Sequence, residues 1–184
     1  GTCERDTLCQ RQFPQLREQW HALLRALPQE VMLQHPVTLQ DEKLTLTRDM
    51  VTGMARMPLY APALAAALPL AVSEASRGRF APLAGLSSAL GSGGGRATSM
   101  AQGMHFSVIC AEDMPRLEQA TDRPGADFGT AYLDMYRKAC AEWPRGSVPA
   151  EFYQVPATPV PTLVLSGGID PVTPPRHGER VSKA

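Results

Sequence analysis

Apolar and polar residues along the first half of the chain recur with the period of a helix. Between Phe13 and Leu27 the large apolar residues are spaced three or four positions apart, and charged residues occupy the other face. We predict an amphipathic helix there, ended by Pro28. The same kind of pattern predicts a helix over residues 48–57, and the alanine- and leucine-rich run 63–76 and residues 80–90 are predicted to be helices as well. Thr47 is placed to cap the first of these, and Gly78 follows the second as a C-terminal cap.

Two short stretches alternate in the manner of strands instead. Residues 36–39 and 43–47 flank the polar segment 40–42, so we predict a short hairpin between them. Beyond residue 90 a helix is expected over residues 128–143.

The most continuous apolar stretch of the second half lies near its end. Residues 160–165 are predicted to form a buried strand that runs into a turn rich in glycine and proline at 166–175. A helix should begin at Arg176. The segment Gly91–Gly95 is the clearest break in the chain and marks a loop or a boundary. It does not have the pattern of a phosphate-binding loop, because no strand precedes it and no lysine follows at the required place.

Composition narrows the classes of partner. The 184 residues include 18 basic and 18 acidic ones, with a formal net charge of zero and no long run of one sign. Binding to nucleic acid or to an anionic membrane is therefore not expected. The longest apolar stretch, 61–72, is interrupted by prolines and is shorter than the roughly 20 residues that span a bilayer. The N-terminal residues do not resemble a signal peptide, so we expect any such segment to lie upstream.

Four cysteines suggest disulfide bonds. Their even number and their spacing, which lacks the C-x2-C of a zinc site, favour two bridges over a metal site, so no metal is predicted. Four cysteines allow three pairings, and four reduced, buried thiols are the alternative. Disulfides would indicate an oxidising compartment.

Asp170 is the candidate for chemistry. An apolar strand that ends in a glycine turn carrying one aspartate is how open α/β folds present catalytic groups at the carboxyl ends of their strands. An aspartate followed by proline is also a common residue of structural turns. The residues themselves leave both interpretations open.

Three motifs, which occur in a fixed order along the chain, favour the catalytic interpretation of Asp170. The segments 103–113 (GMHFSVICAED), 140–144 (CAEWP) and 161–175 (PTLVLSGGIDPVTPP) resemble the C-terminal half of the tripeptidyl aminopeptidase and proline iminopeptidase-like branch of the α/β hydrolases. The opening, Cys3 to Cys9 followed by Phe13-Pro14, is similar to the start of that branch's helical lid. The resemblance implies a fragment of an α/β hydrolase: a mostly helical lid (residues 1–102) and a partial α/β core with one clear buried strand (103–184).

The resemblance also implies a Ser-Asp-His triad in which Asp170 is the acid. No serine has glycine two positions away on both sides, so the nucleophile is expected upstream. The catalytic histidine of the family follows the acid by a further strand, whereas His177 lies only seven positions on, so this chain by itself should be inactive. His21, His35 and His105 are interpreted as surface or packing residues.

Further roles follow from the resemblance alone. Related iminopeptidases use a glutamate to bind the substrate's ammonium group, and Glu112 lies at the comparable place, with Asp113 as the alternative. Both could instead simply stabilise a helix end. The implied disulfides are Cys3–Cys9 and Cys110–Cys140, and the implied location is secreted or periplasmic.

The expected parent enzyme is an aminopeptidase that uses no cofactor. Its partners would be a peptide substrate and the remainder of the α/β-hydrolase core. Two alternatives remain: an esterase or amidase of the same fold, and a non-catalytic helical module that binds a partner.

Overall fold

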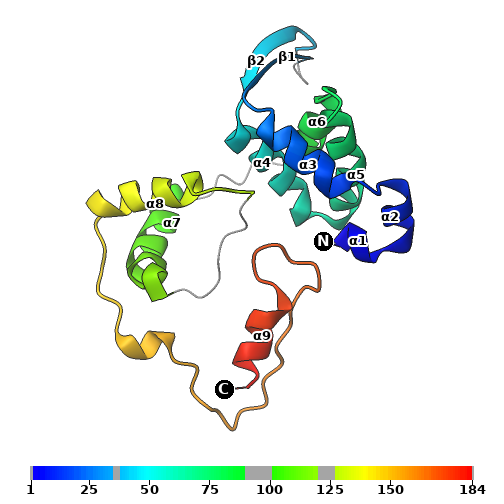
Figure 1. The fold of residues 1–184 in the computed structure, drawn as a ribbon. Coiled ribbons are helices and arrows are strands. Elements are labelled where there is room, and N and C mark those ends of the chain that lie inside the picture. Colours follow the sequence, from blue (N-terminus) through cyan, green and yellow to red (C-terminus); the bar gives the residue numbers. More distant parts are fainter. Residues whose placement is uncertain (1, 35–37, 90–100, 120–126, 184) are drawn as a thin grey trace. The chain divides into compact units, whose positions relative to one another are not determined.

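A computed structural model describes residues 2–34, 38–89, 101–119 and 127–183. The chain divides into two compact units, Gly1–Gly95 and Arg96–Ala184, which are described separately (Figure 1). The glycine-rich segment Gly91–Gly95 lies outside the described residues. In the part of the chain that is described, helices predominate and the sheet has two antiparallel strands.

The N-terminal unit is helical apart from one hairpin. Its elements are α1 (Thr2–Arg5), α2 (Thr7–Gln12), α3 (Leu16–Arg25), β1 (Gln29–Gln34), β2 (Asp41–Leu46), α4 (Arg48–Arg56), the 3-10 helix η1 (Met57–Tyr60), α5 (Pro62–Ala75) and α6 (Ala81–Ala89). The four helices predicted in this unit are confirmed as α3, α4, α5 and α6.

The predicted helix caps are also confirmed. The Thr47 hydroxyl accepts a hydrogen bond from the Met50 backbone N–H at 3.3 Å, which satisfies a donor of the first turn of α4. Gly78 follows α5 with φ of +83°, a conformation that glycine adopts without steric cost. Asp6 caps α2 in the same way as Thr47 caps α4.

The hairpin exists, but its first strand was placed wrongly. β1 pairs with β2 antiparallel, with Gln29 opposite Leu46 and Gln34 opposite Asp41. Leu39, expected in the first strand, has φ of +58° and lies in the connection. The alternation in β1 is real, since Val31 and Leu33 face inward while Glu30 and Gln34 face outward. Met32 lies between Val31 and Leu33 but is exposed. The three apolar residues in a row therefore do not show the alternation in the sequence.

A single apolar cluster holds the N-terminal unit together. It joins α3, the hairpin, α4, α5 and α6, and its buried members are Leu23, Leu24, Leu33, Leu46, Val51, Ala71, Ala75, Phe80 and Leu83. Because these residues come from every longer element of the unit, burial of apolar area is what keeps its helices together.

The C-terminal unit has a small, covalently tied core. Its elements are α7 (Gln102–Val108), the π-helical segment η2 (Ile109–Asp113), the 3-10 helix η3 (Met114–Gln119), α8 (Ala131–Glu142), the 3-10 helix η4 (Ala150–Tyr153) and α9 (Pro175–Val181). α7 and α8 lie side by side (Figure 1), and the Cys110–Cys140 disulfide joins η2 to α8. Helices predicted at 128–143 and from Arg176 are confirmed as α8 and α9.

The predicted buried strand at 160–165 is not formed. Residues 161–167 form neither helix nor strand and pair with no strand of the described chain. Leu163 and Leu165 are 81% and 82% exposed. A buried strand needs neighbours that satisfy its backbone groups on both edges and cover both faces, and the described residues form only one hairpin, in the other unit. The prediction of a buried strand from this apolar stretch is therefore wrong for the described structure. Among the described residues, no helix has the length and apolar character needed to cross a membrane.

Candidate functional site

The segment from Gly167 to Thr173 turns sharply around the carboxylate of Asp170. The Asp170 backbone N–H donates to the Gly167 carbonyl at 3.2 Å, which closes the turn. Gly167 belongs here because its α-carbon approaches the aspartate closely: a Cβ at this position would lie 3.3 Å from Asp170 Cβ. The glycine predicted to shape the turn thus allows the chain to fold back next to Asp170.

The Asp170 side chain accepts three hydrogen bonds from the residues that follow it. Its Oδ1 accepts from the backbone N–H groups of Val172 at 2.8 Å and Thr173 at 2.9 Å, and its Oδ2 accepts from the Thr173 hydroxyl at 2.8 Å. These bonds fix the carboxylate relative to its own backbone, because all three donors belong to the same short turn.

The same bonds keep Asp170 ionised. The backbone N–H of Thr173, then that of Val172 and then the Thr173 hydroxyl hold the pKa of Asp170 below its ordinary value, since each favours the charged carboxylate. A carboxylate has about four acceptor positions. The bonds within the turn use two acceptor positions on Oδ1 and one on Oδ2. The second position on Oδ2 can therefore accept from a donor outside the turn. An ionised, fixed carboxylate with a remaining acceptor position is what is needed to orient an imidazole.

Glu112 and Asp113 end the π-helical segment η2 (Ile109–Asp113). Single π-helical turns are uncommon and occur often at functional sites. The Glu112 side chain is half-buried, whereas Asp113 is exposed. Glu112 is therefore the more sheltered of the two carboxylates.

The backbone at Glu112 is held from two sides. The Tyr153 hydroxyl donates to the Glu112 carbonyl at 2.8 Å, and the guanidinium of Arg116 lies 4.2 Å from the centre of the Tyr153 ring. On the other side the buried Cys110–Cys140 disulfide, whose Cα atoms are 5.1 Å apart, anchors η2 to α8. η2 is thus tied to two segments that are distant along the chain.

The structure does not join the two candidate sites. The Asp170 carboxylate accepts from Val172 and Thr173, whereas the Glu112 carbonyl accepts from Tyr153, so each candidate site is held by its own neighbours. His105 shares a hydrogen bond of 2.6 Å with the Tyr136 hydroxyl and contacts the rings of Phe106 and Tyr136, which agrees with a packing role. His35 lies outside the described residues. No group of three potential metal ligands is found in the described ranges.

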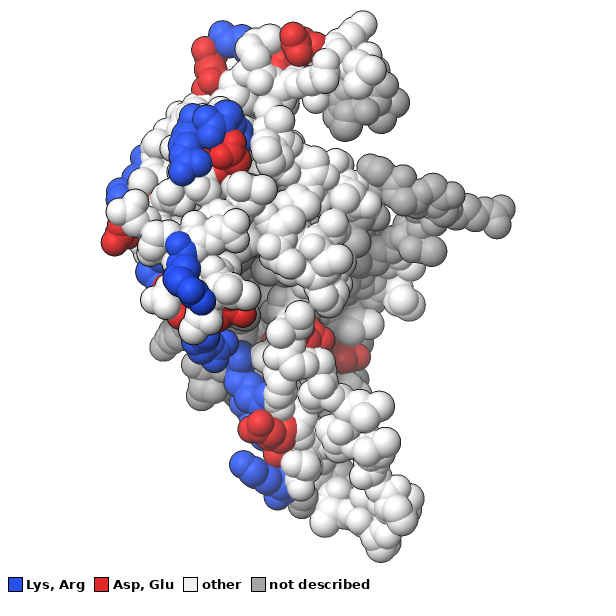
Figure 2. Space-filling view, turned by 90° about the vertical axis from the view of Figure 1, so that its right-hand side faces the viewer, with Lys and Arg blue, Asp and Glu red and all other residues white. Residues whose placement is uncertain are grey.

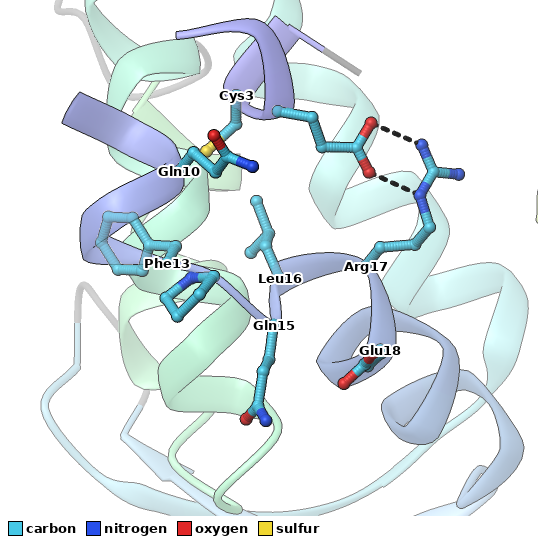
Figure 3. Close-up of a pocket in the computed structure, with 9 residues that line it drawn as sticks. Cys3, Gln10, Phe13, Gln15, Leu16, Arg17 and Glu18 are labelled. Atoms are coloured by element: carbon cyan, nitrogen blue, oxygen red, sulfur yellow. Dashed lines mark hydrogen bonds and ion pairs between the residues drawn. The ribbon is translucent and has the colours of Figure 1, made fainter. Parts of the chain in front are cut away.

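Cys3 of the N-terminal disulfide lines a pocket next to an ion pair between Glu4 and Arg17 (Figure 3). Cys3 and Cys9 are bonded, as the resemblance implied. Glu4 accepts from Arg17 Nε at 2.6 Å and from Nη2 at 2.8 Å. The Arg17 guanidinium lowers the pKa of Glu4 to about 2. Because both side chains are largely exposed, this pair orients α1 against α3 more than it stabilises the fold.

Charged side chains on the surface lie close to others of opposite sign (Figure 2). Exposed pairs such as Lys43 with Glu30 and Arg137 with Asp134 show the same arrangement.

Two residues that matter at these sites were not singled out from the sequence. Thr173 supplies two of the three bonds to Asp170, and its position three residues after an aspartate was the available signal. Tyr153 lies 41 positions from Glu112. A contact of that sequence separation leaves no local pattern.

Comparison with known proteins gives one match, to the end of the chain. Residues 125–184, which include Asp170, α8 and α9, match a family model of the α/β hydrolases. The family is described as TAP-like protein, and the match places this part of the chain in the α/β-hydrolase superfamily, similar to the tripeptidyl aminopeptidases. Neither a curated protein nor a solved structure matches the chain significantly. The family assignment indicates a hydrolase.

Proposed function

We propose that this chain supplies the acid of a Ser-Asp-His triad and the substrate's ammonium-binding carboxylate to an exported aminopeptidase. The main support is the Asp170 carboxylate, which is ionised, fixed by three hydrogen bonds and left with an acceptor position, within a segment of a hydrolase family. The serine and the histidine would come from polypeptide outside residues 1–184, as would the rest of the α/β core.

In the proposed reaction Asp170 keeps its negative charge throughout. It accepts a hydrogen bond from the imidazole, fixes the tautomer, and stabilises the imidazolium that forms when the serine hydroxyl gives up its proton and attacks the peptide carbonyl. The imidazolium then protonates the leaving amine, and water hydrolyses the acyl-enzyme by the same route in reverse. The lowered pKa of Asp170 suits this role, because a carboxylate that took up the proton could no longer accept the bond.

Glu112 would select peptides with a free N-terminus. Its half-buried side chain could pair with the substrate's ammonium group, and the Tyr153 bond and the Cys110–Cys140 disulfide would keep that carboxylate in position. Asp113, one residue further and more exposed, is the alternative. Two disulfides in one chain support an oxidising, extracytoplasmic location.

In the complete hydrolase, segment 160–165 would be a strand of the sheet. Its exposed leucines are the residues that neighbouring strands and helices of the α/β core would cover. This explains why a stretch with the composition of a buried strand has no partner among the described residues.

Labelling with a serine-reactive fluorophosphonate tests the enzyme class in the full-length protein. We expect one labelled serine, and labelling that is lost when the protein is denatured first. Chromogenic aminoacyl and tripeptidyl substrates, each compared with its N-acetylated form, then test the N-terminal preference. Absence of labelling would contradict the serine mechanism, and equal cleavage of free and acetylated substrates would contradict the role of Glu112 and favour an esterase or amidase.

A further inference from the structure

The loop that carries Asp170 begins and ends at one contact, between α9 and residues 164–166. Gly178, in the middle of α9, lies directly against Ser166 and Val164. A Cβ added at Gly178 would overlap Ser166 Oγ and lie 3.2 Å from Val164 Cγ1. An alanine fits here only if the Ser166 hydroxyl and the Val164 side chain rotate away or α9 moves.

A glycine in this helix calls for an explanation. Glycine lowers helix stability relative to alanine, because it loses the most backbone freedom on folding. Gly178 also has no positive φ, so backbone conformation does not require it. By contrast, a Cβ on Gly85, in α6, would meet nothing within 4 Å. The close approach to Ser166 is what distinguishes Gly178.

The closure matters because of what lies between the two ends. From Ser166 the chain passes through the Gly167–Asp170 turn, the hydrogen bonds from Val172 and Thr173 to the carboxylate, and Pro174, whose carbonyl accepts from the His177 N–H at 3.0 Å. Each internal bond fixes the loop locally. The close approach of Gly178 to Ser166 ties its far end back to the segment from which it began.

We infer that Gly178 is a positioning residue for Asp170: its missing side chain lets α9 dock on Ser166, and this contact fixes the direction in which the carboxylate points. The inference rests on the proposed function of Asp170. A side chain at position 178 would turn the Ser166 hydroxyl and the Val164 side chain away from α9 and so loosen the contact that holds the turn between them. A displacement of about 1 Å at a catalytic group can reduce the rate on the order of 100-fold.

The test compares four variants: Gly178→Ala, Ser166→Ala, the double variant Gly178→Ala/Ser166→Ala, and Gly85→Ala as a matched helical control. Removing the Ser166 hydroxyl leaves its Cβ at 3.6 Å from the new methyl group, an ordinary contact, so the double variant should restore the fit. Ser166→Ala and Gly85→Ala should behave like the unaltered protein.

The first readout needs no catalysis. The carboxyl pKa of Asp170, followed by carbon-13 NMR in the 184-residue chain, should rise towards the ordinary aspartate value in Gly178→Ala, because the bonds from Val172 and Thr173 loosen. It should return to the low value in the double variant. An unchanged pKa in folded Gly178→Ala, or no return in the double variant, would overturn the inference. If Gly178→Ala does not fold, recovery of the fold by Ser166→Ala supports the contact, and failure to recover it overturns the contact.

The second readout is turnover by the full-length hydrolase. We expect kcat of Gly178→Ala to fall on the order of 100-fold with KM little changed, and the double variant to regain most of it. Equal kcat in Gly178→Ala and Gly85→Ala would also overturn the inference. If the NMR results are as expected while even the unaltered protein cleaves no peptide, the proposed function fails and the structural role of Gly178 stands.

Discussion

Replacing Asp170 by asparagine separates the shape of the turn from its charge. The asparagine side chain has the same size, and its carbonyl oxygen can still accept from the N–H groups of Val172 and Thr173 at the positions that Oδ1 occupies. The amide nitrogen would face the Thr173 hydroxyl, which can change from donor to acceptor. All three contacts of the turn can therefore persist.

The expected cost to catalysis is nevertheless large. The remaining position on Oδ2, which in Asp170 can accept from an imidazole N–H, becomes an N–H donor in Asp170→Asn. The imidazole would then be held in the wrong tautomer and its cation would lose a negative neighbour. The corresponding exchange in a serine-protease triad lowers kcat by about 10⁴-fold with the geometry intact, which corresponds to about 5.5 kcal/mol of transition-state stabilisation. Loss of one neutral hydrogen bond would account for only about 1 kcal/mol.

The assay is kcat of the full-length hydrolase on its best chromogenic peptide, with circular dichroism to confirm folding. Thr173→Val is the matched control: it removes the hydroxyl bond to Oδ2 and keeps both backbone bonds, so its kcat should fall no more than about tenfold, the equivalent of one hydrogen bond. If Asp170→Asn retains kcat within tenfold of the unaltered enzyme, Asp170 is a structural turn residue and the reasoning is refuted.

Three further predictions concern other parts of the chain. Removing the Cys110–Cys140 disulfide, with both residues changed to alanine, should lower the free energy of unfolding of the C-terminal unit by about 3.5 kcal/mol, because the bond closes a loop with a sequence separation of 30; a urea midpoint equal to that of the unaltered protein would contradict this. Tyr153→Phe, which loses only the hydroxyl that donates to the Glu112 carbonyl, should raise KM for peptides with a free N-terminus several-fold and leave N-acetylated substrates unaffected; an equal change for both substrates would exclude positioning of Glu112. Since the folded pKa of Asp170 lies below its unfolded value, its turn should be stable above the ordinary aspartate pKa and weaken as the pH falls through the lowered value; NMR shifts of Val172 that do not follow this titration would count against the three-bond turn.

The sequence predicted what depends on local periodicity. Helical spacing of apolar residues located α3 and α4, because the burial of one helix face requires that spacing wherever the helix packs. The alanine- and leucine-rich run that forms α5 was predicted from its composition. Caps such as Thr47 were predictable for the same reason, since the donor and acceptor lie within one turn. The turn at Asp170 was visible from its glycines and prolines, and the resemblance pointed to the residue within it.

Only the tertiary structure decided the features that depend on distant partners. Pairing with β2 places the first strand of the hairpin at Gln29–Gln34, although residues 36–39 alternate as well, because register is set by which face reaches the core. The burial of Leu163 also depends on distant partners: an apolar stretch becomes a buried strand only where neighbouring strands lie beside it, and here Leu163 is exposed. The Tyr153 bond to Glu112 and the close approach of Gly178 to Ser166 join residues far apart in the chain or on different elements, and no local pattern encodes such contacts.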